Sequence, residues 1–161
     1  MTTSLRLLTL ALFISSTFCL TDCKKDREPE PDKRSQREIW LTTPGWNLQS
    51  IIDVRTTPVG VVTTDSLSPS VFFSACNLDD LTHFNADQTL TIDDGTIKCQ
   101  PPAPPSTGTW AFGTNETEIV FDAAAPGRKI ATLTATTLAL EFAETYPDGT
   151  IWVQTQTYVA K

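Results

Sequence analysis

The chain has 161 residues, of which 40% are hydrophobic, and its 12 basic and 19 acidic side chains give a net charge of −7. This length and apolar content are typical of one domain with a single modest core. So acidic a chain has no broad surface for phosphates, which excludes nucleic acid as a partner. It also needs an anchor other than charge to stay on an anionic membrane.

The N-terminal segment has the pattern of a secretory signal. One basic residue, Arg6, precedes an apolar stretch of 14 residues from Leu7 to Leu20. Such a stretch is typical of the hydrophobic region of a signal peptide, whereas a membrane-spanning helix needs roughly 20 apolar residues. We therefore predict a cleaved leader, with an uncleaved membrane anchor as the alternative.

The four residues from Leu20 to Cys23, Leu-Thr-Asp-Cys, end this apolar stretch. They resemble the lipobox of bacterial lipoproteins, in which a leucine lies three residues before the cysteine that receives a diacylglycerol. Asp22 departs from the small residue usual at its position, and Cys19 is the competing cysteine. The resemblance implies a lipoprotein signal peptide over residues 1–22 and stable anchoring through acyl chains on Cys23. The implied location is the cell envelope, on the periplasmic or outer face of the outer membrane; a soluble secreted protein is the alternative.

Residues 23–38 are predicted to form a flexible tether. Positions 24–38 hold six basic and five acidic residues, two prolines and no large apolar side chain. Such a segment cannot bury enough apolar surface to offset its ordering entropy. Its Cys-Lys-Lys-Asp start also resembles the sorting signal of lipoproteins exported to the cell surface, with a plain spacer as the alternative. The fold is expected to begin at Ile39.

Residues 39–161 are predicted to form one all-β domain. Thr, Val and Ile are frequent, and no stretch keeps apolar residues at helical spacing. The alternation is clearest at Leu138, Leu140 and Phe142, which predicts one buried and one solvated face. Eight antiparallel strands joined by short turns would leave two exposed edges, and closure into an up-and-down barrel removes both. The predicted strands cover residues 46–55, 81–85, 89–93, 109–113, 117–122, 128–134, 137–144 and 151–159.

Short motifs along this domain occur in a recognisable order. They are a first strand led by Trp46, Cys76-Asn77-Leu78-Asp79-Asp80, Phe84-Asn85-Ala86-Asp87-Gln88-Thr89, Cys99, Gly108-Thr109-Trp110 and Leu133-Thr134-Ala135-Thr136-Thr137-Leu138. The series resembles the lipocalin-like domain of Gram-negative bacterial lipoproteins and covers about residues 46–160. Members often carry a Phe-x-x-Asp-Gly-Thr turn, and here Gln88 replaces the glycine. The resemblance implies a small calycin-type barrel, and most members have no assigned ligand or reaction.

Two cysteines remain once the leader is removed and Cys23 is lipidated. Cys76 and Cys99 form an even pair in an oxidising compartment, which predicts a structural disulfide worth about 3 kcal/mol. A redox or metal-binding thiol pair is the alternative, but neither a Cys-x-x-Cys spacing nor a histidine cluster supports it.

No constellation in the sequence indicates catalysis, a cofactor or a metal. His83 is the single histidine, and Asp79 and Asp80 precede it on a segment too short for three ligands to converge. There is no Gly-x-Ser-x-Gly motif, glycine-rich phosphate loop or nucleophile pair. We therefore expect a protein that is not an enzyme.

The last predicted strand carries the candidate ligand-lining residues. Trp152, Gln154, Gln156 and Tyr158 share one face of that strand. If this face points inward, it lines an aromatic pocket with polar groups; if it points outward, the interior is filled by the Val, Ile, Leu and Phe of the strands. A lumen above ~300 Å³ would favour binding of a small apolar molecule. A packed lumen with an exposed apolar patch would favour the alternative, a structural or protein-interaction module on the envelope.

Overall fold

The computed structural model describes residues 32–100 and 106–161. The predicted signal peptide, Cys19, Cys23 and residues 24–31 of the predicted tether lie outside the described residues. The helices are α1 (Gln36–Thr42), η1 (Pro69–Val71), η2 (Ala75–Asn77) and η3 (Thr114–Glu116). The strands are β1 (Trp46–Thr56), β2 (Val62–Leu67), β3 (Leu81–Phe84), β4 (Thr89–Asp93), β5 (Thr107–Phe112), β6 (Glu118–Phe121), β7 (Ala124–Leu133), β8 (Thr137–Thr145) and β9 (Ile151–Ala160). Within this part of the chain, no helix is both long and apolar enough to span a bilayer.

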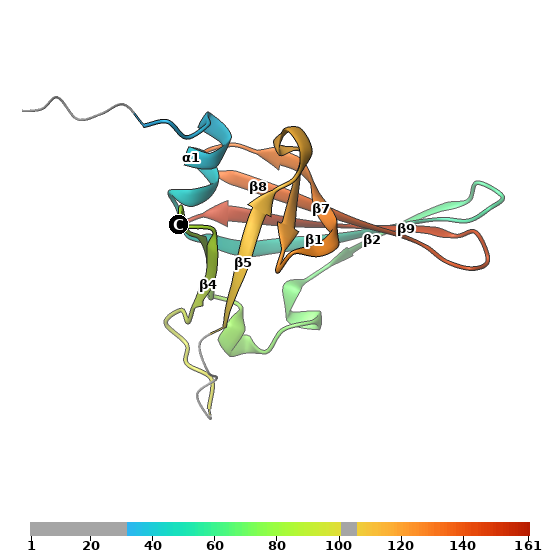
Figure 1. The fold of residues 1–161 in the computed structure, drawn as a ribbon. Coiled ribbons are helices and arrows are strands. Elements are labelled where there is room, and N and C mark those ends of the chain that lie inside the picture. The colour runs from blue at the N-terminus through green and yellow to red at the C-terminus, as the bar shows by residue number, and fades with distance from the viewer. Residues whose placement is uncertain (1–31, 101–105) are drawn as a thin grey trace, which may run out of the picture. The chain divides into compact units, whose positions relative to one another are not determined.

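Eight of the strands form a closed antiparallel ring. Each strand from β3 to β9 pairs with its neighbour in sequence, and β1 pairs with both β3 and β9. The β1–β9 pairing runs from Trp46 opposite Ala160 to Thr56 opposite Ile151, and this ladder closes the ring (Figure 1). The predicted all-β, eight-stranded up-and-down barrel is thereby confirmed, and its arrangement is lipocalin-like.

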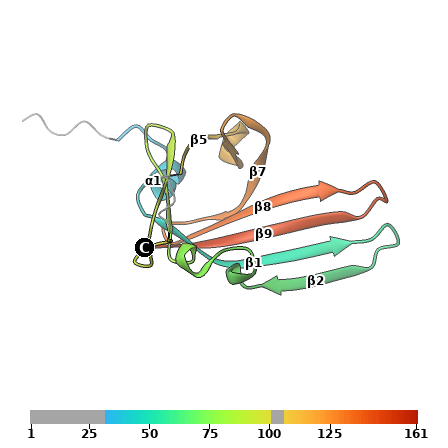
Figure 2. The ribbon, with the colours of Figure 1, turned by 90° about the horizontal axis from the view of Figure 1, so that it is seen from below.

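A ninth strand, β2, lies outside this ring and was missed in the sequence analysis. It pairs with β1 from Ile51 opposite Leu67 to Thr56 opposite Val62. Five of its six residues are exposed, so it carries no alternating apolar pattern for a sequence to display. In Figure 2, β2, β1, β9 and β8 lie side by side as one sheet whose hairpin loops extend away from the rest of the barrel.

A short helix, α1, precedes the barrel and was also missed. Ser35 caps it by accepting a hydrogen bond from the backbone N–H of Glu38, 3.0 Å away. Leu41 anchors the helix, because its side chain is fully buried in the barrel core. Residues 36–38 are therefore helical, although the sequence analysis assigned them to the flexible tether. The spacing Ser35-x-x-Glu38 is that of a capping box and was the available signal.

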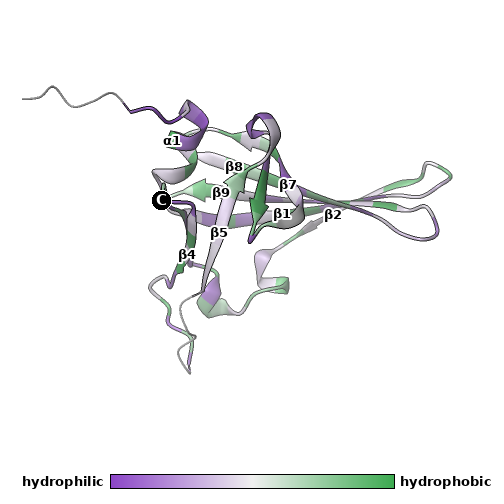
Figure 3. Ribbon diagram, in the orientation of Figure 1, coloured by the Kyte–Doolittle hydropathy of each residue, from purple (hydrophilic) through white to green (hydrophobic). Residues whose placement is uncertain are grey.

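Large side chains form the core of the barrel. Figure 3 shows hydrophobic residues distributed over the barrel strands with hydrophilic residues between them. Phe84 and Trp110 meet edge to face with ring centroids 5.6 Å apart, and Trp110 meets Phe112 in the same way at 5.4 Å. The buried members of this cluster are Leu41, Trp46, Phe84, Trp110, Ile119, Ile130, Leu133, Leu138 and Leu140.

The predicted disulfide between Cys76 and Cys99 is confirmed. The two Cα atoms are 5.2 Å apart, and the bond joins η2 to the loop that follows β4. The disulfide therefore fastens the segment between β2 and β3 (residues 68–80) to the loop that follows the β3–β4 hairpin.

The β3–β4 hairpin turn holds a residue in the left-handed region. Gln88 has φ +67°, and the turn is closed by hydrogen bonds from Asn85 N–H to the Thr89 carbonyl and from Gln88 N–H to the Asn85 carbonyl, both 2.9 Å. A side chain in this region costs about 1–2 kcal/mol, and glycine escapes most of that cost.

We expect Gln88→Gly to raise the free energy of unfolding by about 1 kcal/mol, because the backbone keeps its conformation without the Cβ clash. Urea unfolding followed by tryptophan fluorescence measures this change. Gln88→Ala, which keeps the Cβ atom, should stay within about 0.5 kcal/mol of the original protein. Equal stability of the glycine and alanine variants would contradict the strain assigned to this turn.

Candidate ligand cavity

The face of β9 that carries Gln156 and Tyr158 points into the barrel. Leu138 lies opposite Tyr158 and Leu140 opposite Gln156 in the β8–β9 ladder. Residues directly opposite in an antiparallel pair share a face of the sheet. Leu138 and Leu140 are 0% and 2% exposed and belong to the core cluster, so the face they share with β9 is the inner one.

A cavity of about 330 Å³ lies within the barrel beside Tyr158. Apolar side chains from four strands, β3, β4, β6 and β8, form most of its wall, with Arg128 and Tyr158 as the groups with strong polarity. The other lining residues are Thr82, Phe84, Leu90, Ile92, Phe121 and Leu140. The interior is thus only partly filled, and the unfilled part carries a guanidinium and a phenol.

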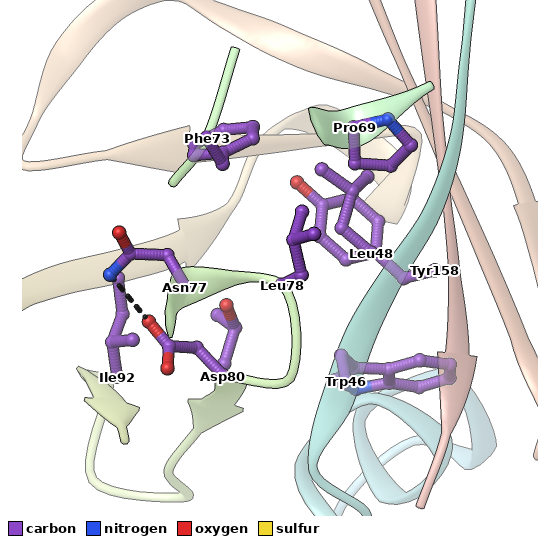
Figure 4. A pocket seen from close by; sticks show the side chains of 10 residues that line it. Trp46, Leu48, Pro69, Phe73, Asn77, Leu78, Asp80, Ile92 and Tyr158 are labelled. Carbon is purple, nitrogen blue, oxygen red and sulfur yellow. Dashed lines mark hydrogen bonds between the residues drawn. The ribbon is translucent and has the colours of Figure 1, made fainter. Parts of the chain in front are cut away.

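A second hollow, of about 250 Å³, lies beside Trp46, Leu48 and Tyr158 (Figure 4). It shares Thr82, Ile92 and Tyr158 with the cavity, and the 68–80 segment supplies another part of its wall. β1 and β3 meet there at one register pair only. Phe73, which lines the hollow, is 43% exposed, so the hollow reaches the surface. We define it as the side opening of the cavity.

A chain of side-chain hydrogen bonds borders the cavity, and we call it the inner polar network. Its members are Asp53, Gln154, Gln156, Tyr158 and Arg128. Arg128 Nη1 donates to Gln156 Oε1 at 2.7 Å, and the Tyr158 hydroxyl donates to the same oxygen at 2.9 Å. The chain of bonds continues from Gln156 Nε2 to Gln154 Oε1 at 2.8 Å and from Gln154 Nε2 to Asp53 Oδ1 at 3.1 Å. Each amide therefore donates toward the carboxylate and accepts from the guanidinium side.

This direction follows from the ends of the network. Arg128 can only donate hydrogen bonds, and Asp53 Oδ1 accepts the bond at the other end, so both glutamine amides have one orientation that satisfies every bond. Asp53 is 6% exposed and lies opposite Gln154 in the β1–β9 ladder. Burial raises the pKa of Tyr158 above its ordinary value of 10.0, and the neighbouring positive charge of Arg128 opposes the rise. Tyr158 is therefore a neutral hydrogen-bonding group at neutral pH.

Trp152 belongs to the same face of β9 but does not line the cavity. It lies opposite Arg55 on β1 and Glu144 on β8, near the hairpin end of the strand. Its ring packs edge to face on Phe142 with centroids 5.6 Å apart. Of the four predicted lining residues, the structure thus places Tyr158 in the cavity wall, Gln156 and Gln154 behind it, and Trp152 away from it.

Two residues of the network, Arg128 and Asp53, were missed in the sequence analysis. Both sit on inward positions whose neighbours two residues away, Ile130 and Ile51, are buried. A polar residue two positions from an inward-facing isoleucine on the same strand points into the barrel, and this pattern could have identified both residues. It could not be read without knowing which strands pair, because the two residues are 75 positions apart in the sequence.

The acidic pair before β3 has a structural role. Asp79 Oδ2 accepts hydrogen bonds from the backbone N–H groups of Thr96 and Ile97, and Asp80 Oδ1 accepts one from Gly95 N–H at 3.2 Å. These bonds hold the loop that follows β4. Across residues 32–100 and 106–161, no group of three or more His, Cys, Asp and Glu side chains is close enough to hold a metal ion.

Comparison with solved structures finds matches of low similarity. The solved structures that match include bovine odorant binding protein complexed with its natural ligand and the same protein complexed with undecanal. Each is 14% identical, with a TM-score of 0.39, and the match covers 82% of this chain and 77% of the bovine chain. No family model matches the chain, and no curated protein matches it. The barrel assignment rests on the closed ring of strand pairs.

Proposed function

We propose that this protein is a non-catalytic binding protein that holds a small apolar molecule inside its barrel, and that it is anchored to the bacterial envelope by lipid on Cys23. The observation that carries the binding proposal is the cavity of about 330 Å³ with apolar walls and two polar groups. Small-molecule sites in proteins are concave, mostly apolar and provided with a few polar groups that orient the ligand. The volume lies at the lower end of the range for such sites, about 300–1,000 Å³, which favours a small ligand.

The side opening supports the same function. A ligand that enters the lumen needs a path, and the side opening shares three lining residues with the cavity. The alternative function, a docking module with a filled barrel, is disfavoured by the unfilled lumen. The surface nonetheless exposes apolar side chains near the hairpin loops, including Val59 at 85% and Val62 at 59%.

Filling the cavity tests the binding proposal. Leu90 lines the cavity from β4, so Leu90→Trp should occupy space that a ligand chain would use. Excluding about two methylene groups from the site lowers the affinity for the neutral probe decanol about tenfold, at roughly 0.8 kcal/mol per methylene. Isothermal titration calorimetry of the original protein should find one decanol site.

The matched control is Thr91→Trp, one position along the same strand and on the opposite face of the sheet. It places the same indole ring outside the barrel and should leave decanol affinity unchanged. An original protein that binds no decanol, or an equal loss of affinity in both variants, would refute ligand binding in the lumen.

The anchor is supported by the lipobox-like residues Leu20 to Cys23 and by the hydrophobic stretch before them. With Cys23→Ala, no thiol is present at that position to take a diacylglycerol, and we expect the protein to move from the membrane fraction to the soluble fraction of its own cells. Cys19→Ala is the control and should stay with the membranes. Release by Cys19→Ala with retention of Cys23→Ala would assign the lipid to Cys19, and retention of both variants would overturn the lipid anchor.

A further inference from the structure

Arg128 is a charged side chain placed toward the barrel interior. It lies opposite Ile119 in the β6–β7 ladder, and Ile119 is fully buried in the core. The next residue, Lys129, faces outward, where its Nζ meets Glu141 Oε2 at 2.7 Å with a side chain that is 70% exposed. Among the residues that line the 330 Å³ cavity, Arg128 is the one with a formal charge.

The guanidinium has no carboxylate partner within the described residues. The ion pairs of Arg37, Lys98 and Lys129 in this part of the chain do not include it. Arg128 itself is held by the 2.7 Å hydrogen bond to Gln156 and by the ring of Phe121, whose centroid lies 5.4 Å from its central carbon. A guanidinium has five N–H donors, so most of its donor capacity is left for another group.

This arrangement is unusual for so acidic a domain. Residues 39–161 contain 5 basic and 13 acidic side chains, yet none of the acidic ones pairs with the cation in the cavity wall. Asp53, at the far end of the inner polar network, is separated from Arg128 by two glutamines. Asp80 lines the side opening, but its carboxylate oxygens accept from Asn77 and from Gly95 N–H. A partly buried charge without a counter-charge is unfavourable, and such exceptions cluster at functional sites.

We infer that the ligand is an apolar chain that ends in a carboxylate, and that this carboxylate pairs with Arg128 while the chain lies against the apolar wall of the cavity. The inference rests on the proposed binding function and names its ligand class. The planar fork of a guanidinium matches the two oxygens of a carboxylate. The Gln156 bond and the Phe121 ring fix the fork in place before the ligand arrives, so little side-chain freedom is lost on binding.

The test compares decanoate with decanol, which have the same chain length and differ in the charged headgroup. Calorimetry on the chain carrying Cys23→Ala, which needs no detergent, should show decanoate binding at least about tenfold more tightly than decanol. Arg128→Met should lose the preference and bind the two probes with about equal affinity. Lys129→Met removes the same charge one residue away on the outer face and should keep the preference.

The outcomes separate this inference from the proposed function. Equal affinity for both probes in the unsubstituted cavity overturns the carboxylate inference and leaves apolar binding intact. Binding of neither probe overturns the proposed function itself. If Arg128→Met does not fold, Arg128→Lys decides: it keeps the charge but not the planar fork, and we expect a reduced preference for decanoate. A full preference in Arg128→Lys would contradict recognition through the fork.

Discussion

Trp46→Ala is expected to lower the free energy of unfolding by about 4 kcal/mol, the largest single loss that we expect from a side chain of the barrel. The Trp46 side chain is fully buried, and its Nε1 donates to the Leu41 carbonyl at 2.8 Å. In the strand ladders it lies opposite both Thr82 and Ala160. One side chain therefore ties the helix α1, the first strand and the closing strand together. Urea unfolding gives the measurement.

Trp46→Phe separates packing from the hydrogen bond. It keeps an aromatic ring in the core and leaves the Leu41 carbonyl without its donor, so the loss should be smaller, about 2 kcal/mol. If Trp46→Ala costs less than 1 kcal/mol, or no more than Trp46→Phe, the residue does not hold the junction that we assign to it.

Removal of the disulfide by the double substitution Cys76→Ala and Cys99→Ala is expected to cost about 3 kcal/mol. The bond closes a loop of sequence separation 23, and a cross-link of this span restricts the unfolded chain by about that free energy. Thermal and urea unfolding of the oxidised protein and the double variant measure the difference.

The same change should affect the side opening. The 68–80 segment forms part of its wall, and the disulfide fastens that segment to the loop after β4. We expect faster exchange of backbone amides in the segment with little change in the β8–β9 ladder, because local unfolding follows the weakest tertiary restraints. Reduction of the original protein with a thiol should reproduce both effects. A double variant as stable as the original, with unchanged exchange, would contradict the restraint.

The elements predicted correctly from the sequence are those whose pattern is local. Leu138, Leu140 and Phe142 alternate within one strand, although Ala139 between them is also buried, and Pro147-Asp148-Gly149 lies in the turn between the last two predicted strands, with Gly149 at φ +84°. By contrast, β2 was not predicted, because it has almost no buried face and its position is set by pairing with β1. Helix α1 is seven residues long with Leu41 as its buried residue, too short to show a helical period.

The candidate site was predicted in part for the same reason. The alternation of Gln154, Gln156 and Tyr158 along one strand indicated a polar face, but its direction depended on the partner residues in β8. Arg128 and Asp53 join that face from strands remote in sequence, and only the register brings them together. The composition of the site depends on cross-strand pairing and therefore requires the structure, whereas strands and turns can be predicted from the sequence.

A crystal structure of the full chain carrying Cys23→Ala, grown with decanoate, tests the account most directly. We expect one decanoate in the cavity, its chain against Phe84, Leu90 and Phe121 and its carboxylate oxygens within hydrogen-bonding distance of Arg128. A lumen closed by its own side chains, or decanoate bound only on the outer surface of the barrel, would contradict a ligand-binding interior.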